Sequence, residues 1–395
     1  MAEWRRATLG DIADESDGSL KTGPFGTVFQ ASEYAPVGTP VVSVGEIRYG
    51  SLSVTEKTKR VGPQTLRRLR EYLLRQGDLV FGRKGAVDRS AWVKAGEDGY
   101  FLGSDAIRVR LGDVVDSRFM AYQVQSPRIR SWIKQHAVGT TLASLNEPIL
   151  RLLPVVVPPL TEQRAIAATL GALDDKIDSN RRATSLAEAL GDAVFASVAS
   201  STTRLLDAGT LVMGSSPPGT TYNEEGAGLP FYQGVRDFGA RFPSRRVWTT
   251  GPIRLSEAGD SLVSVRAPVG RLNRSRELCC IGRGLAAVRS PFPSTLYYAL
   301  RAAEDLWVPF NQEGTVFGAV NRRDLGNALL AWPGSIESTT KLELTLGATD
   351  SKIASLVLES ERLAALRDVL LPELLSGRIR AGDLPDPATA PAETR

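Results

Sequence analysis

A long stretch after residue 159 repeats apolar residues at the spacing of a coiled-coil seam. Two prolines precede it, and Thr161 is a natural N-cap, with Glu162 in the first turn of the expected helix. Alternating spacings of four and three residues place apolar side chains along one stripe of a helix. These apolar positions are Ile166, Leu170, Leu173, Ile177, Leu190, Val194 and Val198. The pattern predicts a first long helix over residues 159–199.

A second stretch near the end of the chain repeats this pattern over residues 336–380. Its apolar positions, close to the same register, are Leu342, Leu346, Ile353, Leu356, Leu363 and Leu370. A helix of roughly 38 residues is about 57 Å long at 1.5 Å per residue. The natural partner of each apolar stripe is the other one, which predicts an antiparallel coiled coil. The alternative is that each helix packs on its own domain.

The rest of the chain alternates short strand-like runs with helical stretches. Residues 40–44, 78–81 and 106–110 are bounded by Gly, Pro and Asp, as strands and turns require. Helical stretches are expected at 117–136 and 294–308. This is an α+β pattern and not a strict βαβ alternation. We therefore expect an α+β fold with two pseudo-symmetric mixed α/β domains joined by two long helices.

The chain also contains an internal duplication. Residues 170–177 return as residues 346–353, at an offset of 176. Further matches, in the same order, pair 139–146 with 314–321, 77–80 with 259–263, and 84–89 with 266–271. Several ordered matches predict a twofold repeat. The expected parts are a first domain (1–158), a first spacer helix (159–199), a second domain (200–335), a second spacer helix (336–380) and a disordered tail (381–395).

Basic and acidic blocks alternate along the 395 residues, although the net charge is only +4. Residues 1–160 and 200–335 are basic, whereas 161–199 and 336–395 are acidic. Every cation in the second basic block is arginine, which suits bidentate contact with guanine edges and phosphates. A GC-rich genome that favours arginine explains this composition equally well. Two basic modules on a rigid spacer nevertheless suit two major-groove segments roughly 34 Å apart.

The sequence contains few residues that could support catalysis. His136 is the single histidine, and the adjacent Cys279 and Cys280 suit neither a disulfide framework nor a zinc site. Neither a Gly-x-x-x-x-Gly-Lys-Ser/Thr phosphate loop nor the Asn-Pro-Pro-aromatic motif of amino-methyltransferases is present. We expect a chain that is not itself an enzyme. A cytoplasmic location is expected, because we find no secretory signal and no apolar run long enough to span a bilayer.

Three segments resemble the type I restriction-modification specificity (S) subunit family. Residues 157–182, which contain Pro-Pro-Leu-Thr-Glu-Gln-Arg, are the most specific of them. Residues 371–379 resemble the usual end of the family's second helix, and residues 21–27 (Lys-Thr-Gly-Pro-Phe-Gly-Thr) resemble a loop of its first recognition domain. The second domain opens instead with Met-Gly-Ser-Ser-Pro-Pro-Gly-Thr over 213–220, which suggests that the two domains read different half-sites.

The resemblance implies a sequence-specific DNA-binding subunit with two target-recognition domains, each reading one half of a bipartite, asymmetric site. It further implies that the helices dock two methyltransferase subunits, and that two motor/nuclease subunits join them in the restriction complex. No cofactor is expected on this chain. S-adenosylmethionine, and ATP with Mg, are expected on the partner subunits. The competing hypotheses are a degenerate methyltransferase or nuclease subunit and a coiled-coil scaffold without sequence-specific reading.

Candidate DNA contacts lie in or beside glycine-containing loops or in hydroxyl- and amide-rich segments. In the first domain they are Lys21, Arg83, Lys84, Arg89, Thr140, Thr141 and Asn146. In the second domain they are Arg236, Arg266, Arg271, Arg274, Arg283, Thr315 and Asn321. For each residue the alternative is a solvated surface position or a salt bridge. Two aromatic residues also have two interpretations, as base contacts or as core residues: Tyr232 and Trp248. The carboxylates on the first helix form either a solvated face or a docking surface for the methyltransferase subunits; they are Glu162, Asp174, Asp175 and Asp178.

Overall fold

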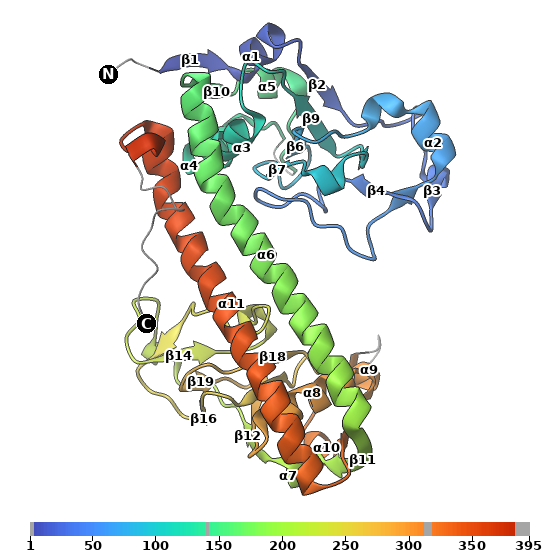
Figure 1. Ribbon diagram of the computed structural model, residues 1–395, viewed down its shortest axis with the longest axis vertical. Helices are drawn as coiled ribbons and strands as arrows, with labels where there is room; N and C mark the ends of the chain where they lie inside the picture. The colour runs from blue at the N-terminus through green and yellow to red at the C-terminus, as the bar shows by residue number, and fades with distance from the viewer. Residues whose placement is uncertain (1–3, 140–141, 312–317, 384–395) are drawn as a thin grey trace. The chain divides into compact units, whose positions relative to one another are not determined.

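The computed structural model describes residues 4–139, 142–311 and 318–383. The chain divides into two compact units, each of which contains helices and small sheets (Figure 1). The first unit is built from residues up to 175 and from 363 onward, and the second from residues 176–362. Two long helices belong to both units, because α6 (Leu160–Val198) and α11 (Ile336–Ser376) each cross a boundary between them.

The first unit contains a strand pair and two four-stranded sheets. Its strands are β1 (Arg5–Thr8), β2 (Ser19–Thr22), β3 (Tyr34–Ala35), β4 (Thr39–Val42), β5 (Arg60–Val61), β6 (Leu79–Gly82), β7 (Ser90–Trp92), β8 (Phe101–Leu102), β9 (Ala106–Arg110) and β10 (Pro154–Val157). Strands β1 and β10 pair antiparallel. The antiparallel sheet β2-β9-β6-β7 lies beside a mixed sheet of order β3-β5-β4-β8, in which β4 and β8 are parallel.

The second unit repeats this topology. Its strands are β11 (Ala199–Arg204), β12 (Thr210–Met213), β13 (Tyr222–Asn223), β14 (Leu229–Tyr232), β15 (Trp248–Thr249), β16 (Leu255–Ser256), β17 (Ser261–Ser264), β18 (Leu272–Arg274), β19 (Cys279–Ile281), β20 (Leu285–Arg289) and β21 (Leu329–Pro333). The pair β11-β21, the sheet β12-β20-β17-β18 and the sheet β13-β15-β14-β19-β16 match the three sheets of the first unit in order. The additional strand β16 corresponds to a single bridge, Leu73 to Phe101, in the first unit. The predicted duplication is therefore confirmed.

Shorter helices connect and cover the sheets. They are α1 (Leu9–Glu15), α2 (Pro63–Arg68), α3 (Ser117–Gln125), α4 (Pro127–His136), α5 (Glu147–Arg151), α7 (Leu205–Ala208), α8 (Pro293–Ala302), α9 (Val308–Asn311) and α10 (Arg322–Gly326). The helix predicted over 117–136 is broken in two, because the ring of Pro127 disfavours helical backbone at Ser126, whose ψ is 147°. Likewise, the stretch predicted over 294–308 ends as α8 at Ala302 and continues as a 3-10 turn.

Within each unit the two long helices run antiparallel, as predicted. In the first unit the Arg367 guanidinium on α11 donates to Asp174 on α6 at 2.7 Å. In the second unit the Asn180 amide on α6 donates to Glu359 on α11 at 2.8 Å. The prediction for Leu190 is wrong, since this side chain is exposed. The buried face of α6 in that region instead consists of Asn180, Thr184, Gly191 and Phe195.

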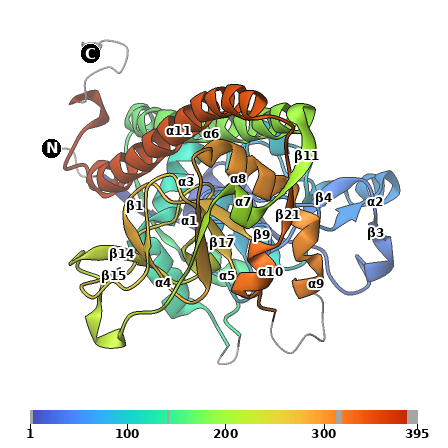
Figure 2. The same ribbon diagram turned by 90° about the horizontal axis from the view of Figure 1, so that it is seen from below.

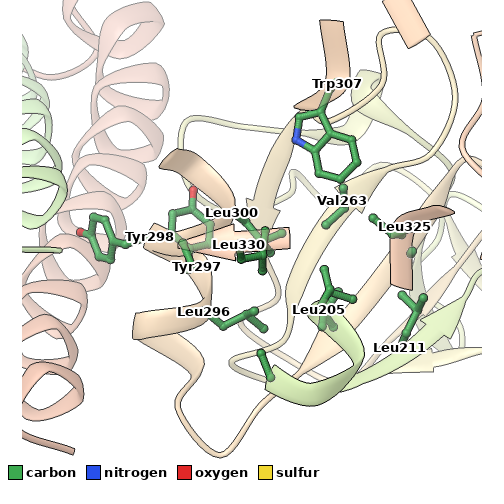
Figure 3. Close-up of a cluster of buried hydrophobic side chains, with 14 of the residues drawn as sticks. Leu205, Leu211, Val263, Leu296, Tyr297, Tyr298, Leu300, Trp307, Leu325 and Leu330 are labelled. Atoms are coloured by element: carbon green, nitrogen blue, oxygen red, sulfur yellow. The ribbon is translucent and has the colours of Figure 1, made fainter. Parts of the chain in front are cut away.

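The long helices also complete the core of the second unit, so packing of a helix on its own domain occurs together with helix pairing. Leu342 and Leu346 of α11 and Phe195 of α6 belong to the same buried cluster as the α8 tyrosines. Figure 3 shows Tyr298 at one end of this cluster, pointing toward the long helices. Helix α8 lies between those helices and β17 (Figure 2).

The end of α11 joins a small core in the first unit. There Leu374 packs with Ile166 and Leu170 of α6 and with Phe119 of α3. Part of the predicted disordered tail is corrected, because Ala381–Asp383 form the 3-10 helix η7 and Ala381 is buried in this cluster. The rest of that tail, residues 384–395, lies outside the described residues.

Candidate nucleic-acid interface

In the first unit, the loop between β6 and β7 lies against the segment that precedes α5. The Gly85 amide donates to the Ala143 carbonyl at 2.8 Å, and the Leu145 amide donates to the Arg83 carbonyl at 2.8 Å. Gly85 has φ +72°, a conformation that glycine adopts without steric cost. Two predicted segments that are far apart in sequence therefore form one surface.

The second unit repeats this arrangement at the loop between β17 and β18. Arg266 pairs with Ala319 in an isolated bridge, and the Val320 amide donates to the Val265 carbonyl at 3.0 Å. The equivalent bridge in the first unit joins Lys84 to the segment before α5. Each unit thus presents a basic hairpin loop held against a second loop, and this pair of loops is the candidate interface.

Two of the predicted contact residues are helix caps. The Asn146 side-chain oxygen accepts from the Ile149 amide, and that of Asn321 accepts from the Asp324 amide, both at 2.9 Å. The Asn321 amide group also donates to the Asp324 carboxylate at 2.8 Å. Both asparagines fix the start of the short helix that follows the loop, which accounts for their residue type without a DNA contact.

A groove of about 800 Å³ opens beside the loops of the first unit. Lys21 from β2, Arg83 from the hairpin loop and Asn146 all line it, so three predicted residues converge there. Phe25 lies at the same groove with 60% of its surface exposed. The Arg83 guanidinium lies 5.2 Å from the centre of the Phe25 ring, a cation–π arrangement.

A second basic cluster in the first unit surrounds the carboxylate of Asp88. Arg130 and Lys134 each approach it at 3.0 Å, and the Tyr49 hydroxyl donates to it at 3.0 Å. Burial, the largest influence, raises the pKa of Asp88, but the hydrogen bonds from Lys134, Arg130 and Tyr49 outweigh it and lower that pKa overall. The exposed Tyr49 ring also lies 3.9 Å from the Arg130 guanidinium and 6.0 Å from that of the predicted Arg89. Two cations, Arg130 and Lys134, thus share one carboxylate.

Four predicted arginines of the second unit are exposed, three of them on loops and Arg236 in the 3-10 helix Val235–Asp237. They are Arg236, Arg266, Arg271 and Arg283. Within the described residues, none of the four forms an ion pair. The Arg283 amide donates to the Ser216 hydroxyl at 3.3 Å, which places this arginine beside the Ser-Ser-Pro-Pro segment. Unpaired exposed cations on loops are available to phosphates and base edges.

Arg274 has a structural role instead, so its prediction as a DNA contact is corrected. Its side chain is nearly buried and pairs with Asp350 on α11. The same carboxylate pairs with the buried Arg241. Strand β18 is therefore held to α11 by charge, and only 11% of the Arg274 side chain is exposed.

The remaining predicted positions divide into paired lysines and positions that cannot be placed. Lys21 pairs with Glu71 at 2.9 Å, and Lys84 lies 3.6 Å from Asp105. Both ammonium groups remain partly exposed. The candidates Thr140, Thr141 and Thr315 lie outside the described residues.

The helix carboxylates hold the first unit together. Asp174 accepts from the Tyr122 hydroxyl at 2.6 Å and from Arg367, and Asp175 accepts from Arg118 at 2.6 Å. Burial and the neighbouring Asp174 raise the pKa of Tyr122, which keeps this phenol a donor. Asp174 is therefore not simply part of a solvated face, because Tyr122 and Arg367 both donate to it.

Glu162 and Asp178 pair with Arg380 and Arg181 at 3.8 and 3.5 Å. In the second unit, Tyr232 is a core residue and Trp248 is half-buried in β15.

No group of three or more His, Cys, Asp or Glu side chains in the described part of the chain could hold a metal ion. No helix among the described residues is long and apolar enough to cross a membrane.

Sequence reasoning missed four side chains around these loops: Phe25, Tyr49, Arg108 and Arg130. Phe25 was within reach, because an aromatic residue flanked by glycines and proline has no adjacent apolar run to pack with. Arg108 lies between two apolar residues in the middle of a strand, and a charge at such a position is a signal of a special environment. Tyr49 and Arg130 carry no local signal, because only the fold brings them to Asp88.

Comparison with known proteins relates this chain to DNA specificity subunits. Residues 1–188 match the model of the type I restriction modification DNA specificity domain. A putative type I restriction enzyme specificity subunit, MjaX of Methanocaldococcus jannaschii, is 26% identical over 378 residues and covers 87% of this chain and 88% of its own length. Residues 1–188 thus match a DNA specificity domain, and nearly the whole chain is similar to a type I restriction enzyme specificity subunit. These similarities support a role in DNA sequence specificity.

Other specificity subunits are more distant. The MjaVIII specificity subunit of the same organism is 20% identical over 185 residues, which is 46% of this chain and 41% of that protein. The crystal structure of the type I restriction-modification S subunit from M. genitalium shares 18% identity, with a TM-score of 0.60. It covers 94% of this chain and 96% of its own. This likeness shows that the two chains share a fold.

Proposed function

We propose that each unit of this specificity subunit reads one half of a bipartite, asymmetric DNA site. The observation that carries the proposal is the duplicated topology, whose two copies present different side chains at their loops. The first unit presents Phe25, Arg83 and Lys84, whereas the second presents Arg266, Arg271 and Arg283. The same scaffold with different reading groups is what an asymmetric split site requires.

The long helices are proposed to dock two methyltransferase subunits. Large apolar side chains are exposed on both helices, including Leu186 and Leu190 on α6 and Leu366 and Val369 on α11. Leu190 and Leu366 are 176 residues apart, so equivalent positions of the repeat expose leucine twice. Solvent-exposed apolar groups in a helical row favour a protein partner.

The chemistry is proposed to reside on those partners. Family resemblance supports S-adenosylmethionine on the methyltransferase subunits and, in the restriction complex, ATP with Mg on two motor/nuclease subunits. This chain would bind no cofactor and would contribute recognition and assembly. A methylation assay on the isolated chain, with the reconstituted complex as positive control, tests this division; transfer by the chain alone would contradict it.

Selection of bound duplexes from a random library tests the reading function. The chain, reconstituted with its methyltransferase partner, is expected to enrich two short defined blocks around an unspecified gap. Replacing residues 1–160 with those of a related subunit should change one block, and replacing residues 200–335 should change the other. Binding that depends on salt but not on sequence, from a well-folded complex, would refute the proposal and leave the scaffold hypothesis.

The gap between blocks tests the spacer. One extra turn in both α6 and α11 adds about 5 Å to each helix, which is one to two base pairs of duplex. Mapping of methylated sites should then show the same two blocks with a longer gap. An unchanged gap in a folded, active complex would show that the helices do not set it.

A further inference from the structure

Arg108 on β9 is a buried cation without a carboxylate. Only 4% of its surface is exposed, yet it forms no ion pair with any described residue. Its guanidinium donates to the Glu71 backbone carbonyl at 3.0 Å and to the Ser19 hydroxyl at 3.1 Å, and its Nε has no partner within the described chain. Burial, followed by the charge of Arg110, lowers the pKa of Arg108. A buried charge without a counter-charge is costly to the fold.

A second cation lies directly opposite Arg108 on the neighbouring strand. Lys21 on β2 is the register partner of Arg108. Like charges at directly opposed positions destabilise a sheet. Lys21 has Glu71 as an ion-pair partner, but that carboxylate is mostly exposed and its attraction is weakened by solvent. Both cations line the groove that also holds Arg83 and the exposed Phe25.

The duplicated sheet provides an internal comparison. In the second unit, the pair equivalent to Lys21 and Arg108 is Val212 and Ala287, which are register partners on β12 and β20. The scaffold therefore forms without cations at these positions.

A neighbouring ion pair behaves differently, because both units keep it. Arg110 donates twice to Asp78, at 2.7 and 2.6 Å, and Arg289 donates twice to Asp260, at 3.0 Å each. The repeated pair is architectural. The Lys21–Arg108 pair belongs to the first unit alone, and this points to a ligand.

We propose that the groove of the first unit binds one phosphate group of the DNA backbone through Lys21, Arg83 and Arg108, with Phe25 against the adjoining nucleoside. A phosphate supplies the counter-charge that Arg108 lacks and that Lys21 receives only from the exposed Glu71 carboxylate. The groove, at about 800 Å³, leaves room for a sugar and base beside it. The inference rests on the proposed function and deepens it, because it assigns this contact to the half-site that the first unit reads.

Neutralisation of single phosphates tests the proposal. The reconstituted complex is titrated with selected duplexes that carry one methylphosphonate at each position in turn. For the natural chain, one position in the first unit's half-site should weaken binding about tenfold. The K21V/R108A variant, which copies the second unit, should be insensitive at that position. Its slope of log affinity against log salt should fall by about 1 for each lost contact.

Two controls keep the outcomes distinct. The K21V/R108A variant should unfold at a temperature no lower than the natural chain and still select the second block. If it does not fold, K21Q, which alters a partly exposed side chain, should show half the change in salt slope. Equal sensitivity of natural and variant chains at every phosphate would overturn the phosphate site while leaving the split motif standing.

A separate experiment distinguishes the DNA backbone from other sources of phosphate. Thermal shifts with inorganic phosphate and with ATP are measured for the natural chain and the variant. If ATP stabilises the natural chain but not the variant, and no DNA position is sensitive, the ligand of the groove is a free nucleotide. That result would overturn the proposal. Failure of the natural complex to select any split motif would instead refute the proposed function, and the inference with it.

Discussion

Replacement of Asp350 by asparagine should loosen the second unit selectively. This carboxylate on α11 is the shared partner of Arg241 and Arg274, and Arg241 is only 1% exposed. Arg241 also lies 3.6 Å from the Tyr297 ring on α8. Asparagine keeps the size of the side chain but removes the charge. Two guanidinium groups then remain in the interior with far less compensation.

The magnitude follows from the burial of the partners. Removal of one member of a buried ion pair costs about 3–5 kcal/mol, because the remaining charge stays desolvated. The equivalent position in the repeat, Asp174, serves as a matched control. Its partners Tyr122 and Arg367 are a hydroxyl and a partly exposed guanidinium. Asp174→Asn should therefore cost only about 1 kcal/mol, as for a weakened hydrogen bond.

Hydrogen exchange with mass spectrometry measures both effects locally, which a global unfolding curve of a two-unit chain does not. A loss of about 3 kcal/mol corresponds to exchange on the order of 100-fold faster. Asp350→Asn should produce that acceleration in peptides from β18 and α8, with little change in α3. Asp174→Asn should accelerate α3 about fivefold. Equal protection in both variants would refute the reasoning that burial decides the cost.

Three further predictions concern packing, pH and DNA contact. A Cβ at Gly191 would lie 2.3 Å from the Tyr298 ring, so Gly191→Ala should destabilise the second unit by about 1–3 kcal/mol in thermal unfolding, whereas Gly347→Ala, which meets nothing closer than 4.0 Å, should be neutral or stabilising. The pKa of Asp88 is lowered in the folded state, so its ionised carboxylate stabilises the fold above the unfolded pKa of about 3.9, and this stabilisation is lost as the pH falls through the lower folded pKa. Asp88→Asn should therefore make the free energy of unfolding less dependent on pH in the acid range, and an unchanged dependence would contradict this. Arg283→Ala should reduce the salt slope of DNA binding by about 1 while leaving the unfolding temperature unchanged, and a loss of stability instead would indicate a structural role.

The long-range features were predictable because they depend on periodicity and repetition. The seam positions Ile166 and Leu170, and their counterparts Leu342 and Leu346, are all buried. The seam at Leu190 was not predictable, because α6 there turns small and polar side chains inward. Near Gly191 the approach of Tyr298 leaves no room for a larger residue. A hydrophobicity pattern cannot register a face that is buried without being apolar.

The candidate interface was predictable at the level of loops and not of atoms. Arg83 and Lys21 converge on one groove although 62 positions separate them in the sequence. Arg274 was chosen by the same reasoning, but its side chain forms an ion pair with Asp350 on α11, which is distant in the sequence. Whether an arginine faces solvent or a carboxylate depends on which elements pack over it, and that information is in the tertiary fold.

The division of the chain has a consequence for biosynthesis. The second unit is one continuous stretch, so it can close while the ribosome is still translating. The first unit begins earlier but finishes later, because Ile166 and Phe119 stay uncovered until Leu374 has emerged. The other buried clusters of the first unit lie wholly within residues 7–157, so only this last cluster waits for the C-terminal segment. A chain that stops after residue 362 would therefore keep the sheets of both units but leave Ile166 and Phe119 uncovered.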